Sequence, residues 1–540
     1  MRPFLTLHNP AAAQKYYQDK LWFDETFYDL ATKHATARPH ALALQDGFTK
    51  LTWQDVIHHA DALARDLIDQ GLCGGDRVSV WMSDCITPVI ALLACSREGF
   101  VCNPSLHKTH TWAEIIERLN RLNTKAFITQ PGWGADPDEI SIDNLYEQAP
   151  SLKVIYEPDT LPKPVKKPDH PPSKTPDHVT YLAFTSGTTG EPKGVMHSAN
   201  TLLSSVRKLV ETWGFDTQTR ILTLSPLSHH IAWVAASEWL VCGGVFITNH
   251  PPPDVHALDW IVQTGATYVL GVPTHAMDIL AEQARRNLPR LGNVSVFYLA
   301  GSPIPPSVAE AFIKQGITPQ NVYGMTENSS HQYTFPDDSF EIIVGTCGRG
   351  GPAYDVCILD PDNPSRYLKT GETGHIAGRG AALMLGYFDN QSASESSFNQ
   401  DGWFMSGDLG SLDEAGNLTI KGRIKDLIIR GGHNIHPAPI EAVALRHPAV
   451  EKAAVFPVPD DRLGEKICIA IIGRITINDL LEHLRREGLS KYDMPEYFAR
   501  VEAFPLTASG KVLKRTLIDQ HRRGELAVAP IKRQTSGLPS

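Results

Sequence analysis

Short apolar runs that each stop at a glycine or a proline are the feature that most constrains the fold of this 540-residue chain. Four of them, VTYLAFT, ILTLSPL, ATYVLGVP and VSVFYLAG, follow one another between residues 179 and 301, with helix-like stretches between them. An unbroken apolar run of this length is typical of a strand buried on both faces. We therefore expect an α/β fold whose strands deliver their carboxyl ends to ligand-binding loops.

The rest of the chain divides into regions that differ in composition and in the pattern of their apolar residues. Residues 23–155 alternate β-rich runs with helix-like stretches, and a proline-rich segment follows at 161–177. Because its prolines forbid regular structure, we expect an exposed, semi-extended linker there. Past Gly371, Gly-rich turns predict antiparallel hairpins. A smaller α/β unit then runs from about Asp426 to Arg523, with AAVFPVP and KICIAIIG as strands.

Composition narrows the classes of function. The net charge of -10 gives no general attraction to nucleic acid, so an anionic ligand must be held by specific groups. The eight cysteines include no C-x-x-C pair, which favours a reducing compartment over a disulfide framework. No segment approaches the roughly 20 apolar residues that cross a bilayer, and the N-terminus has no leader pattern. We expect a cytoplasmic protein without membrane insertion.

The segment 185–194 is the strongest chemical signal. It places three glycines, four hydroxyl side chains and Lys193 directly after a predicted strand. Glycines let backbone N–H groups approach oxygen anions, hydroxyls donate further hydrogen bonds, and the lysine adds a charge. It is not a P-loop, because no hydroxyl residue follows the lysine. We predict a phosphate cradle, with a flexible surface turn as the alternative. Its residues are Thr185, Ser186, Gly187, Thr188, Thr189, Gly190 and Lys193.

This loop resembles the signature of the adenylate-forming superfamily, which includes acyl-CoA synthetases, luciferases and nonribosomal peptide adenylation domains. Motifs count only in their expected context, and here the remaining landmarks follow in order over most of the chain. They are Tyr323-Gly-Met-Thr-Glu327, Ser406-Gly-Asp408, Gly422-Arg-Ile-Lys-Asp426, Gly431 to Pro437 and Pro505 to Lys511. The loop and YGMTENSS look most like bacterial cyclohexanecarboxylate and short- to medium-chain acyl-CoA ligases.

The resemblance implies roles in the YGMTE motif. Tyr323, followed by Gly324, would stack on adenine, and Thr326 would hydrogen-bond a phosphoryl oxygen. Glu327 resembles the family's magnesium-binding acid, since a hard cation shared with phosphate oxygens suits one carboxylate plus waters. The alternatives are a helix N-cap for Thr326 and a first-turn helix acid for Glu327.

Other nucleotide ligands are implied farther along the chain. Gly301 and Ser302 would lie beside the purine, where the alternative is a proline-stiffened turn. Asp408 would accept hydrogen bonds from both ribose hydroxyls, and otherwise it is a hairpin-turn aspartate. Arg423 would reach the ribose or the α-phosphate, and otherwise it belongs to a surface charge run.

The resemblance also implies two domains that move relative to each other. The predicted boundaries are a large N-terminal AMP-binding domain of several subdomains at 1–424, a small mobile α+β domain at 425–525 and a tail at 526–540. Lys425 occupies the hinge position. Lys511 resembles the catalytic lysine, which would neutralise charge as the carboxylate attacks the α-phosphate. The residues that would face the pantetheine arm of coenzyme A are Gly431, Gly432 and His433.

The acid would bind beside Ser225-Pro-Leu-Ser-His-His230, which resembles the family segment that lines the acyl pocket. His229 would gate the carboxylate, and His230 would lie next to it, with satisfied core histidines as the alternative. Adjacent histidines on a strand would point to opposite faces, so we do not favour a metal site. Trp233 and Ser237 would lie one helical turn apart. The opposite wall would hold Met325 and His331.

These features predict an ATP-dependent carboxylate–CoA ligase, an AMP-forming acid–thiol ligase that uses ATP, Mg²⁺ and coenzyme A. The acid and Mg-ATP would give an acyl-adenylate and pyrophosphate, and the coenzyme A thiolate would then attack the activated carbonyl. The aromatic lining suggests a hydrophobic monocarboxylic acid that is medium-chain, alicyclic or arylalkanoic. Loading of a carrier protein and a catalytically inactive nucleotide-binding regulator stay open, as does a homodimer.

Overall fold

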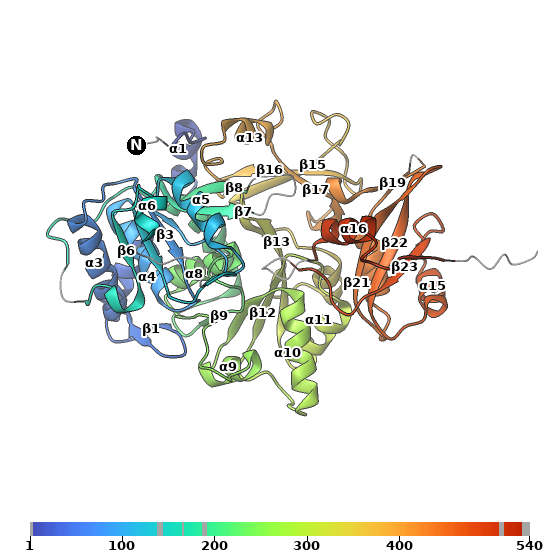
Figure 1. Cartoon of the computed structure of the whole chain (residues 1–540), viewed down its shortest axis with the longest axis horizontal. Helices are drawn as coiled ribbons and strands as arrows, with labels where there is room; N and C mark the ends of the chain where they lie inside the picture. The colour runs from blue at the N-terminus through green and yellow to red at the C-terminus, as the bar shows by residue number, and fades with distance from the viewer. Residues whose placement is uncertain are drawn as a thin grey trace, which may run out of the picture.

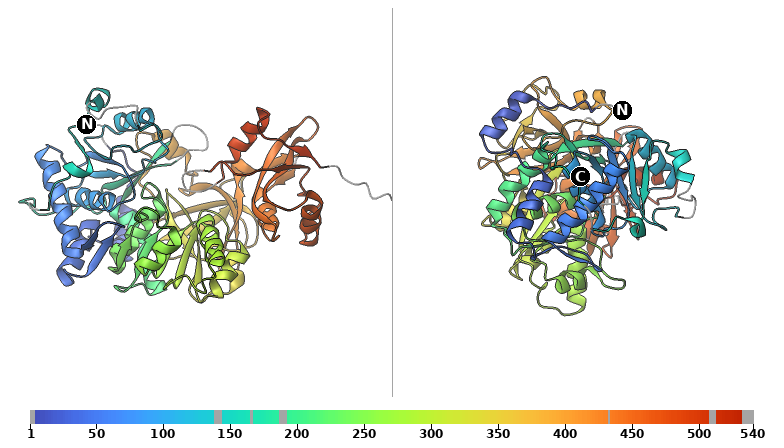
Figure 2. Two further views of the ribbon diagram at one scale, coloured as in Figure 1. Left: turned by 60° about the horizontal axis from the view of Figure 1, so that its bottom comes forward. Right: turned by 90° about the vertical axis from the view of Figure 1, so that its left-hand side faces the viewer.

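The computed structural model describes residues 4–137, 144–164, 167–185, 192–431, 433–506 and 512–531. In the described residues, a large N-terminal part holds three β-sheets and a smaller C-terminal part holds one. The two parts stand side by side in Figure 1, and the left view of Figure 2 separates them most clearly. This arrangement confirms the expected α/β class with a small C-terminal unit.

The largest sheet has eight strands in the order β14-β13-β12-β11-β9-β10-β1-β2. Six of them, from β13 to β1 in that order, run parallel, while β14 and β2 fold back antiparallel at the two edges. Their bounds are β1 (Leu42–Gln45), β2 (Lys50–Thr52), β9 (Arg220–Thr223), β10 (Val245–Ile247), β11 (Tyr268–Gly271), β12 (Val296–Ala300), β13 (Thr318–Met325) and β14 (Ser329–Tyr333). Three of the four predicted apolar runs form neighbouring strands of this sheet.

A second sheet of six strands has the order β6-β5-β3-β4-β7-β8, with only β8 antiparallel to its neighbour. Its bounds are β3 (Arg77–Trp81), β4 (Val101–Asn103), β5 (Ala126–Thr129), β6 (Val154–Tyr156), β7 (Val179–Thr185) and β8 (Lys193–Ser198). The first predicted run, VTYLAFT, is β7. The chain turns back from β7 into β8 through the predicted phosphate loop.

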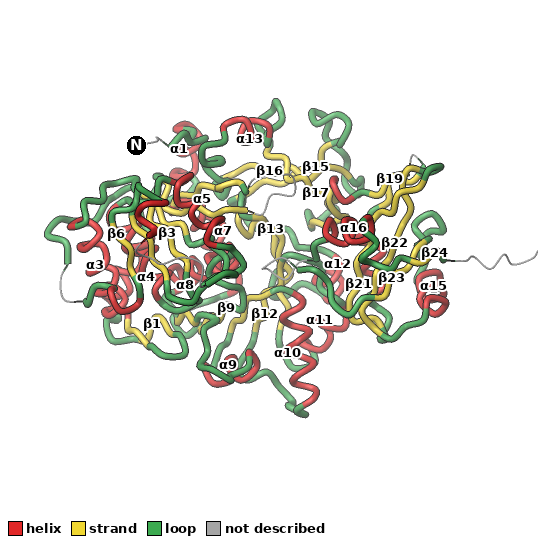
Figure 3. The backbone as a smooth tube through the Cα atoms, viewed as in Figure 1, coloured by secondary structure: helices red, strands yellow, loops and turns green. Residues whose placement is uncertain are grey.

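Helices fill the layer between these two sheets, as Figure 3 shows. They are α2 (Phe27–Ala37), α3 (Trp53–Asp69), α4 (Thr87–Glu98), α7 (Ala199–Trp213) and α8 (His230–Cys242). Ten of the 13 residues of α8 are buried, because a helix that is apolar on every side is stable only when it is covered on every side. Each leucine-sized side chain buried there contributes about 1.5–3 kcal/mol.

Strand alternation assigns the two faces of the large sheet. In β12, Tyr298 and Ala300 join the core between the sheets, whereas Phe297 and Leu299 pack on the outer face. The outer helices of the two sheets are α5 (Trp112–Leu122) and α6 (Leu145–Gln148) on the six-stranded sheet, and α9 (Ala257–Thr264), α10 (Pro273–Arg285), α11 (Pro306–Ile313) and α12 (Phe340–Gly345) on the larger one. Strands covered on both faces explain the unbroken apolar runs.

A third, four-stranded sheet confirms the predicted hairpins. Its strands are antiparallel throughout and follow chain order. Their bounds are β15 (Tyr354–Leu359), β16 (Gly374–Gly380), β17 (Phe404–Leu412) and β18 (Leu418–Arg423), and α13 (Gln391–Ser396) lies between β16 and β17 in sequence. The N-terminal helix α1 (Pro10–Gln18) is followed by Trp22, whose indole donates to the Ala381 carbonyl beside this sheet at 3.0 Å.

The C-terminal part begins after the short 3-10 helix η3 (Ile424–Asp426). Its sheet has the order β20-β19-β22-β23-β24, and β21 pairs with β22. The bounds are β19 (Ile428–Arg430), β20 (His433–Ile435), β21 (Val450–Asp460), β22 (Gly464–Gly473), β23 (Tyr497–Arg500) and β24 (Ala529–Pro530), with α14 (Pro437–Ala444), α15 (Ile477–Arg486) and α16 (Lys514–Arg522). The runs AAVFPVP and KICIAIIG are β21 and β22.

Residues 529–531 of the predicted tail join this sheet. Ala529 and Pro530 pair with β23, and the Ile531 N–H donates to the Glu496 carbonyl at 2.8 Å. An open strand edge offers unpaired backbone groups, which this segment satisfies. The predicted domain boundaries at 424/425 and 525/526 stay predictions.

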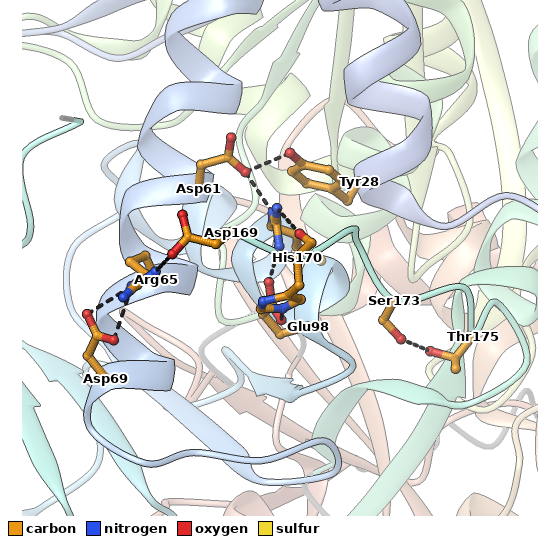
Figure 4. A network of polar contacts seen from close by, with 10 residues as sticks. Tyr28, Asp61, Arg65, Asp69, Glu98, Asp169, His170, Ser173 and Thr175 are labelled. Carbon is orange, nitrogen blue, oxygen red and sulfur yellow. Dashed lines mark hydrogen bonds and ion pairs between the residues drawn. The ribbon is translucent and has the colours of Figure 1, made fainter. Parts of the chain in front are cut away.

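The proline-rich segment 161–177 has no helix or strand in its described residues, as predicted, but it is not a free connector. Figure 4 shows Asp169 and His170 bound to the helices α3 and α4. Asp169 lies 2.7 Å from Arg65, and the His170 imidazole lies 2.7 Å from the Glu98 carboxylate. The prolines leave the chain extended, so the polar residues between them reach partners on the neighbouring helices.

Arg97 explains why the linker is held so closely. Its guanidinium is buried and lies 2.8 Å from Asp61, and it also contacts the Glu98 carboxylate and the His170 carbonyl. The Ser173 N–H donates to the Arg97 carbonyl at 2.7 Å. A buried charge must be paired and hydrogen-bonded, and here the linker supplies part of the pairing. The short 3-10 helix η2 (Pro158–Thr160) precedes the linker.

Candidate active site

The base of the predicted phosphate loop lies on the β7–β8 hairpin. Thr185 and Lys193 are opposite each other in the register of the two strands, and the Thr185 hydroxyl lies 3.4 Å from the Lys193 carbonyl. The Lys193 ammonium sits 4.6 Å from the centre of the Tyr387 ring. The other predicted cradle residues, Ser186, Gly187, Thr188, Thr189 and Gly190, lie outside the described residues.

Thr326 and Glu327 form the tight turn between β13 and β14. The Met325 N–H donates to the Asn328 side chain at 3.0 Å, and the Asn328 N–H returns to the Met325 carbonyl at 3.2 Å. β13 continues past Tyr323 to Met325, and an antiparallel strand follows the turn. The helix-cap alternatives for Thr326 and Glu327 are therefore wrong, because the chain reverses into a strand at this point.

Gly324 makes this close reversal possible. A Cβ atom at this position would lie 1.8 Å from the Ser329 carbonyl oxygen and 2.7 Å from its carbon. No side chain fits so close to backbone atoms, so the motif needs glycine for the hairpin itself. Gly324 is predicted to belong to the nucleotide site, and the hairpin by itself already requires a glycine at this position.

Three contacts from other elements hold the Thr326–Glu327 turn. The His197 imidazole, on β8, lies 2.6 Å from the Thr326 carbonyl. The Met384 N–H donates to the Glu327 carbonyl at 2.7 Å, and the Tyr387 hydroxyl donates to the Glu327 carboxylate at 2.9 Å. The turn is therefore fixed both at its backbone and at its acidic side chain.

The electrostatics of this turn follow from burial. Burial lowers the pKa of His197 to about 4, so the ring is neutral, and its Nε2 carries the proton that the Thr326 carbonyl accepts. The Thr201 hydroxyl lies 2.9 Å from Nδ1. Burial also raises the pKa of Glu327, while the hydrogen bond from Tyr387 opposes that rise. The pKa of Glu327 is therefore raised by burial and held lower by Tyr387 than burial alone would set it.

Asp408 contacts two other residues that the sequence analysis assigned to the nucleotide site, Tyr323 and Arg423. It lies in β17, not in a hairpin turn, and only 9% of its side chain is exposed. The Tyr323 hydroxyl donates to one carboxylate oxygen at 2.7 Å, and Arg423, paired across from it on β18, lies 3.3 Å from the other. The Arg423 side chain is 48% exposed, so the surface alternative holds for its position, although its charge is paired with a buried carboxylate.

Gly301 and Ser302 follow the carboxyl end of β12 and are exposed. β12 is parallel to β13, and Ala300 pairs with Val322, so the two residues lie next to Tyr323 at the same edge of the sheet. Gly301 has a φ of 91°, which side chains rarely adopt. Parallel strands place ligands at this edge, in agreement with the predicted purine position.

Five predicted residues belong to the C-terminal part or its junction. Lys425 is exposed in η3. The Gly431 N–H donates to the Leu463 carbonyl at 2.8 Å, and the His433 ring stacks on Tyr492 at 5.4 Å. These contacts stay within the small part. Gly432 and the predicted catalytic Lys511 lie outside the described residues.

The two adjacent histidines lie at the start of α8 and not on a strand. His229 precedes the helix and stacks on His107 with ring centres 4.4 Å apart. His230 is the first helical residue, stacks on His197 at 5.7 Å and lies 3.4 Å from the Tyr181 hydroxyl. Burial lowers the pKa of His230 to about 3, so this ring is neutral. The strand argument against a metal site is therefore wrong in its geometry.

One helical turn separates Trp233 from Ser237, as expected, and the Ser237 hydroxyl donates to the Trp233 carbonyl at 2.7 Å. Both are buried in the layer between the two sheets. Trp233 belongs to the same cluster as Val322 of β13. These residues thus stand on the α8 side of the large sheet.

Met325 and His331 stand on the other side of the β13–β14 hairpin. The register of the two strands shifts at Tyr323/Gly324, and His331 packs between Tyr323 at 5.4 Å and Tyr354 at 4.3 Å. Met325 packs near Tyr387. Within the described residues, neither ring nitrogen of His331 has a hydrogen-bond partner, and burial lowers its pKa to about 3. The two predicted walls of the acid site are therefore divided between opposite faces of one hairpin.

Sequence reasoning missed His197, Tyr354 and Tyr387. A signal existed for His197, because it alternates with Lys193 and Val195 along β8, and residues at i, i+2 and i+4 share a face. Tyr387 lies in a loop between β16 and α13, where no periodicity predicts a direction. Its place beside Glu327 depends on tertiary packing alone.

The donor set at the turn fits a hard cation. Glu327 supplies a carboxylate and Thr326 a hydroxyl, and one carboxylate suffices for a Mg²⁺ ion that phosphate oxygens also bind. Among the residues that the structure describes, no group of three or more His, Cys, Asp or Glu could hold a metal ion. The searched helices include none of the length and apolar character needed to cross a bilayer.

Known proteins resemble this chain over nearly its whole length. The model of the AMP-binding enzyme family matches residues 31–388, and the model of the AMP-binding enzyme C-terminal domain matches residues 439–511. A medium-chain fatty-acid–CoA ligase of Escherichia coli is 29% identical, covering 95% of this chain and 93% of that protein.

Two further similarities extend the comparison. A 2,3-dihydroxybenzoate-AMP ligase of Bacillus subtilis is 30% identical, covering 94% of this chain and 95% of that protein. Among solved structures, ATP-bound MatB from Rhodopseudomonas palustris has a TM-score of 0.82 and 26% identity, with 92% of this chain and 99% of that one covered.

Proposed function

This chain belongs to the AMP-binding enzyme family, and from that premise we propose that it is a carboxylate–CoA ligase acting on a hydrophobic monocarboxylic acid. The family match confirms the resemblance that the ordered motifs indicated. The chain is an adenylate-forming enzyme of the acyl-CoA synthetase type, an AMP-forming acid–thiol ligase. The acid, the thiol acceptor and the role of each residue are parts of the proposal.

One observation carries the assignment of the ATP site. Tyr387 contacts the Lys193 ammonium with its ring and the Glu327 carboxylate with its hydroxyl. The base of the phosphate loop and the acidic turn therefore meet, although they come from different sheets. ATP phosphates would lie between them, and Thr326 would hydrogen-bond a phosphoryl oxygen. Bound Mg²⁺ would offset phosphate charge there, held by Glu327.

The remaining roles follow the same arrangement. Tyr323, Gly301 and Ser302 would contact the purine, and Asp408 with Arg423 would hold the ribose. His229 would contact the acid carboxylate, beside His230 and Trp233. Lys511 would neutralise charge as the carboxylate attacks the α-phosphate. The 425–525 domain would then turn about Lys425 and present Gly431, Gly432 and His433 to the pantetheine arm.

The hydrophobic acid is proposed from the residues on the α8 side. Trp233, Val322 and Ala300 share one buried cluster, and His230 is neutral, so no fixed charge there favours a second carboxylate. The similarity to a medium-chain fatty-acid–CoA ligase supports this choice, whereas the similarity to an aryl-AMP ligase keeps aromatic acids in the range to be tested.

The test is ATP–pyrophosphate exchange with acids from acetate to decanoate, cyclohexanecarboxylate and phenylacetate. We expect exchange with at least one hydrophobic acid, and an acyl-CoA product when coenzyme A is added. Exchange without acyl-CoA formation would favour a carrier protein as acceptor. No exchange with any acid would contradict the proposal and favour a nucleotide-binding regulator.

A further inference from the structure

The segment that carries His229 is held from the other sheet. Residues 225–229 connect β9 of the eight-stranded sheet to α8, but two of their side-chain contacts, from Asp84 and His107, come from loops of the six-stranded sheet. Asp84 follows the carboxyl end of β3, and His107 follows the carboxyl end of the neighbouring parallel strand β4. Two adjacent strand ends therefore reach across to one short segment.

The backbone of Leu227 is fixed at both its N–H and its carbonyl. Its N–H donates to the Asp84 carboxylate at 2.7 Å, and its carbonyl accepts from the Trp233 indole at 2.6 Å. Leu227 itself is buried. Fixing the peptide groups on both sides of Leu227 sets the direction in which the chain enters the next two residues, Ser228 and His229.

His107 completes the clamp on those two residues. Its Nδ1 lies 2.9 Å from the Ser228 hydroxyl, and its ring stacks on His229 with centres 4.4 Å apart and planes inclined by 26°. His107 is held in turn by Trp81, whose indole donates to its carbonyl at 2.8 Å. Burial lowers the pKa of His107 to about 4, so it is neutral at pH 7 and adds no positive charge to the stack.

We propose that Asp84 and His107 are positioning residues that set the His229 imidazole for the acid carboxylate. Neither needs to touch the substrate. Asp84 acts through the Leu227 peptide, and His107 acts through Ser228 and the ring stack. The proposal rests on the proposed function through the role of His229, and it assigns the orientation of the acid site to the six-stranded sheet.

Two substitutions at Asp84 separate positioning from bulk stability. Asp84→Asn keeps an oxygen acceptor for the Leu227 N–H, whereas Asp84→Ala removes it. Burial raises the pKa of Asp84 to about 7, so its carboxyl is only partly ionised at neutral pH, and its removal leaves the Leu227 N–H without this acceptor. Leaving a buried donor unsatisfied corresponds to roughly a fivefold to hundredfold effect. With octanoate as the probe, we expect Asp84→Ala to lower kcat/KM for the acid by that factor and to leave KM for ATP within about twofold. The kcat/KM of the Asp84→Asn variant for the acid should stay near that of the unaltered protein.

An equal loss for ATP and acid, together with a lower Tm, would show a merely structural role and overturn the proposal. So would an Asp84→Asn variant that fails as badly as Asp84→Ala. His107→Ala should repeat the acid-specific loss, and His107→Asn should recover part of it by offering an acceptor to Ser228.

A spectroscopic measurement keeps this test independent of activity. The ring signals of His107 and His229 in the full-length protein are assigned by NMR with His107→Gln and His229→Gln. We expect Asp84→Ala to move both signals and Asp84→Asn to leave both in place, whether or not the unaltered protein activates octanoate. If the ring signals of His107 and His229 do not move in Asp84→Ala, the proposed positioning role of Asp84 is wrong. Moved signals in a protein that activates no acid would contradict the proposed function alone.

Discussion

The two sides of the β13–β14 hairpin differ in how their polar groups are paired. On the side that faces away from α8, called the outer side here, Tyr323 and Arg423 share the Asp408 carboxylate, and Glu327 is bound by Tyr387. On the side of α8, His230 lies among aromatic rings, is neutral and has an Nε2 without a hydrogen-bond partner among the described residues. The outer side therefore suits a charged ligand, whereas the α8 side suits an apolar one.

The largest expected effect concerns Lys511, which is predicted to come from the C-terminal domain and from neither side of the hairpin. Lys511→Ala should reduce acyl-adenylate formation by roughly a hundredfold to a thousandfold, as for other preorganised electrostatic groups. It should still convert supplied acyl-adenylate to thioester. Pyrophosphate release and thioester formation are measured separately. Lys514→Ala, which removes a nearby lysine paired with Glu441 at 2.7 Å, is the matched control. Equal loss of both half-reactions would refute this division.

The next effect tests the charged side directly. Asp408→Ala should raise KM for ATP by about tenfold to a hundredfold, because it removes a buried charged acceptor and leaves Tyr323 and Arg423 without it. KM for the acid should change much less. Asp355→Ala, on the same sheet but with 71% of its side chain exposed, should change neither. A larger effect of Asp408→Ala on the acid than on ATP would reverse the assignment of the two sides.

A smaller effect on the charged side depends on pH. The Tyr387 hydroxyl lowers the pKa of Glu327, so Tyr387→Phe leaves burial unopposed and raises that pKa. On acidification, the Glu327 carboxylate is then lost at a higher pH. We expect the acidic limb of the kcat/KM profile to move to higher pH, with a loss of about twofold to tenfold on that limb. An unmoved limb would show that Glu327 does not set it. Tyr146→Phe, at an exposed tyrosine, is the control.

The smallest expected effect is on stability and tests the low polarity of the α8 side. Glu238 on α8 has no exposed surface, and its nearest donor, the Tyr268 hydroxyl, is 3.4 Å away. Burial raises its pKa, so its contribution to folding stability is present at low pH and lost as the pH rises through that value.

Glu238→Gln removes this titration. The Tm of the variant should exceed that of the unaltered protein by roughly 2 °C at pH 9, with a smaller difference at pH 6. Calorimetry at the two pH values measures the difference. A difference that is larger at pH 6 would show that Glu238 is stabilised as a carboxylate and that this side is more polar than proposed.

Sequence predicted the layers better than it predicted the directions of side chains. The apolar runs became strands because burial on both faces leaves a pattern in the sequence itself. Tyr323, Asp408 and Arg423 were predicted to lie at one site because each belongs to a recognisable motif, and the structure brings them into contact. The Tyr387–Glu327 and Asp84–Leu227 contacts leave no local pattern, since each joins loops of different sheets. His331 was assigned to the acid wall, yet a register shift at Tyr323/Gly324 turns it toward Tyr354.

The linker teaches a related point. Its prolines predicted the absence of helix and strand, which the structure confirms for the described residues. They could not predict that His170 and Asp169 would find partners on α3 and α4, because those partners lie about 70 to 100 residues earlier in the chain. Local composition sets the backbone conformation, while the pairing of Arg97 decides where the segment lies.

The central claim is that an acyl-adenylate forms before any thiol takes part. A rapid chemical quench of the full-length protein with Mg-ATP and octanoate, without coenzyme A, tests it most directly by mass spectrometry. The account predicts octanoyl-adenylate and pyrophosphate in equal amounts, up to one per active site. When coenzyme A is added, the octanoyl-adenylate should be converted into octanoyl-CoA and AMP, while the pyrophosphate remains. Formation of ADP, or release of pyrophosphate only after coenzyme A is present, would contradict it.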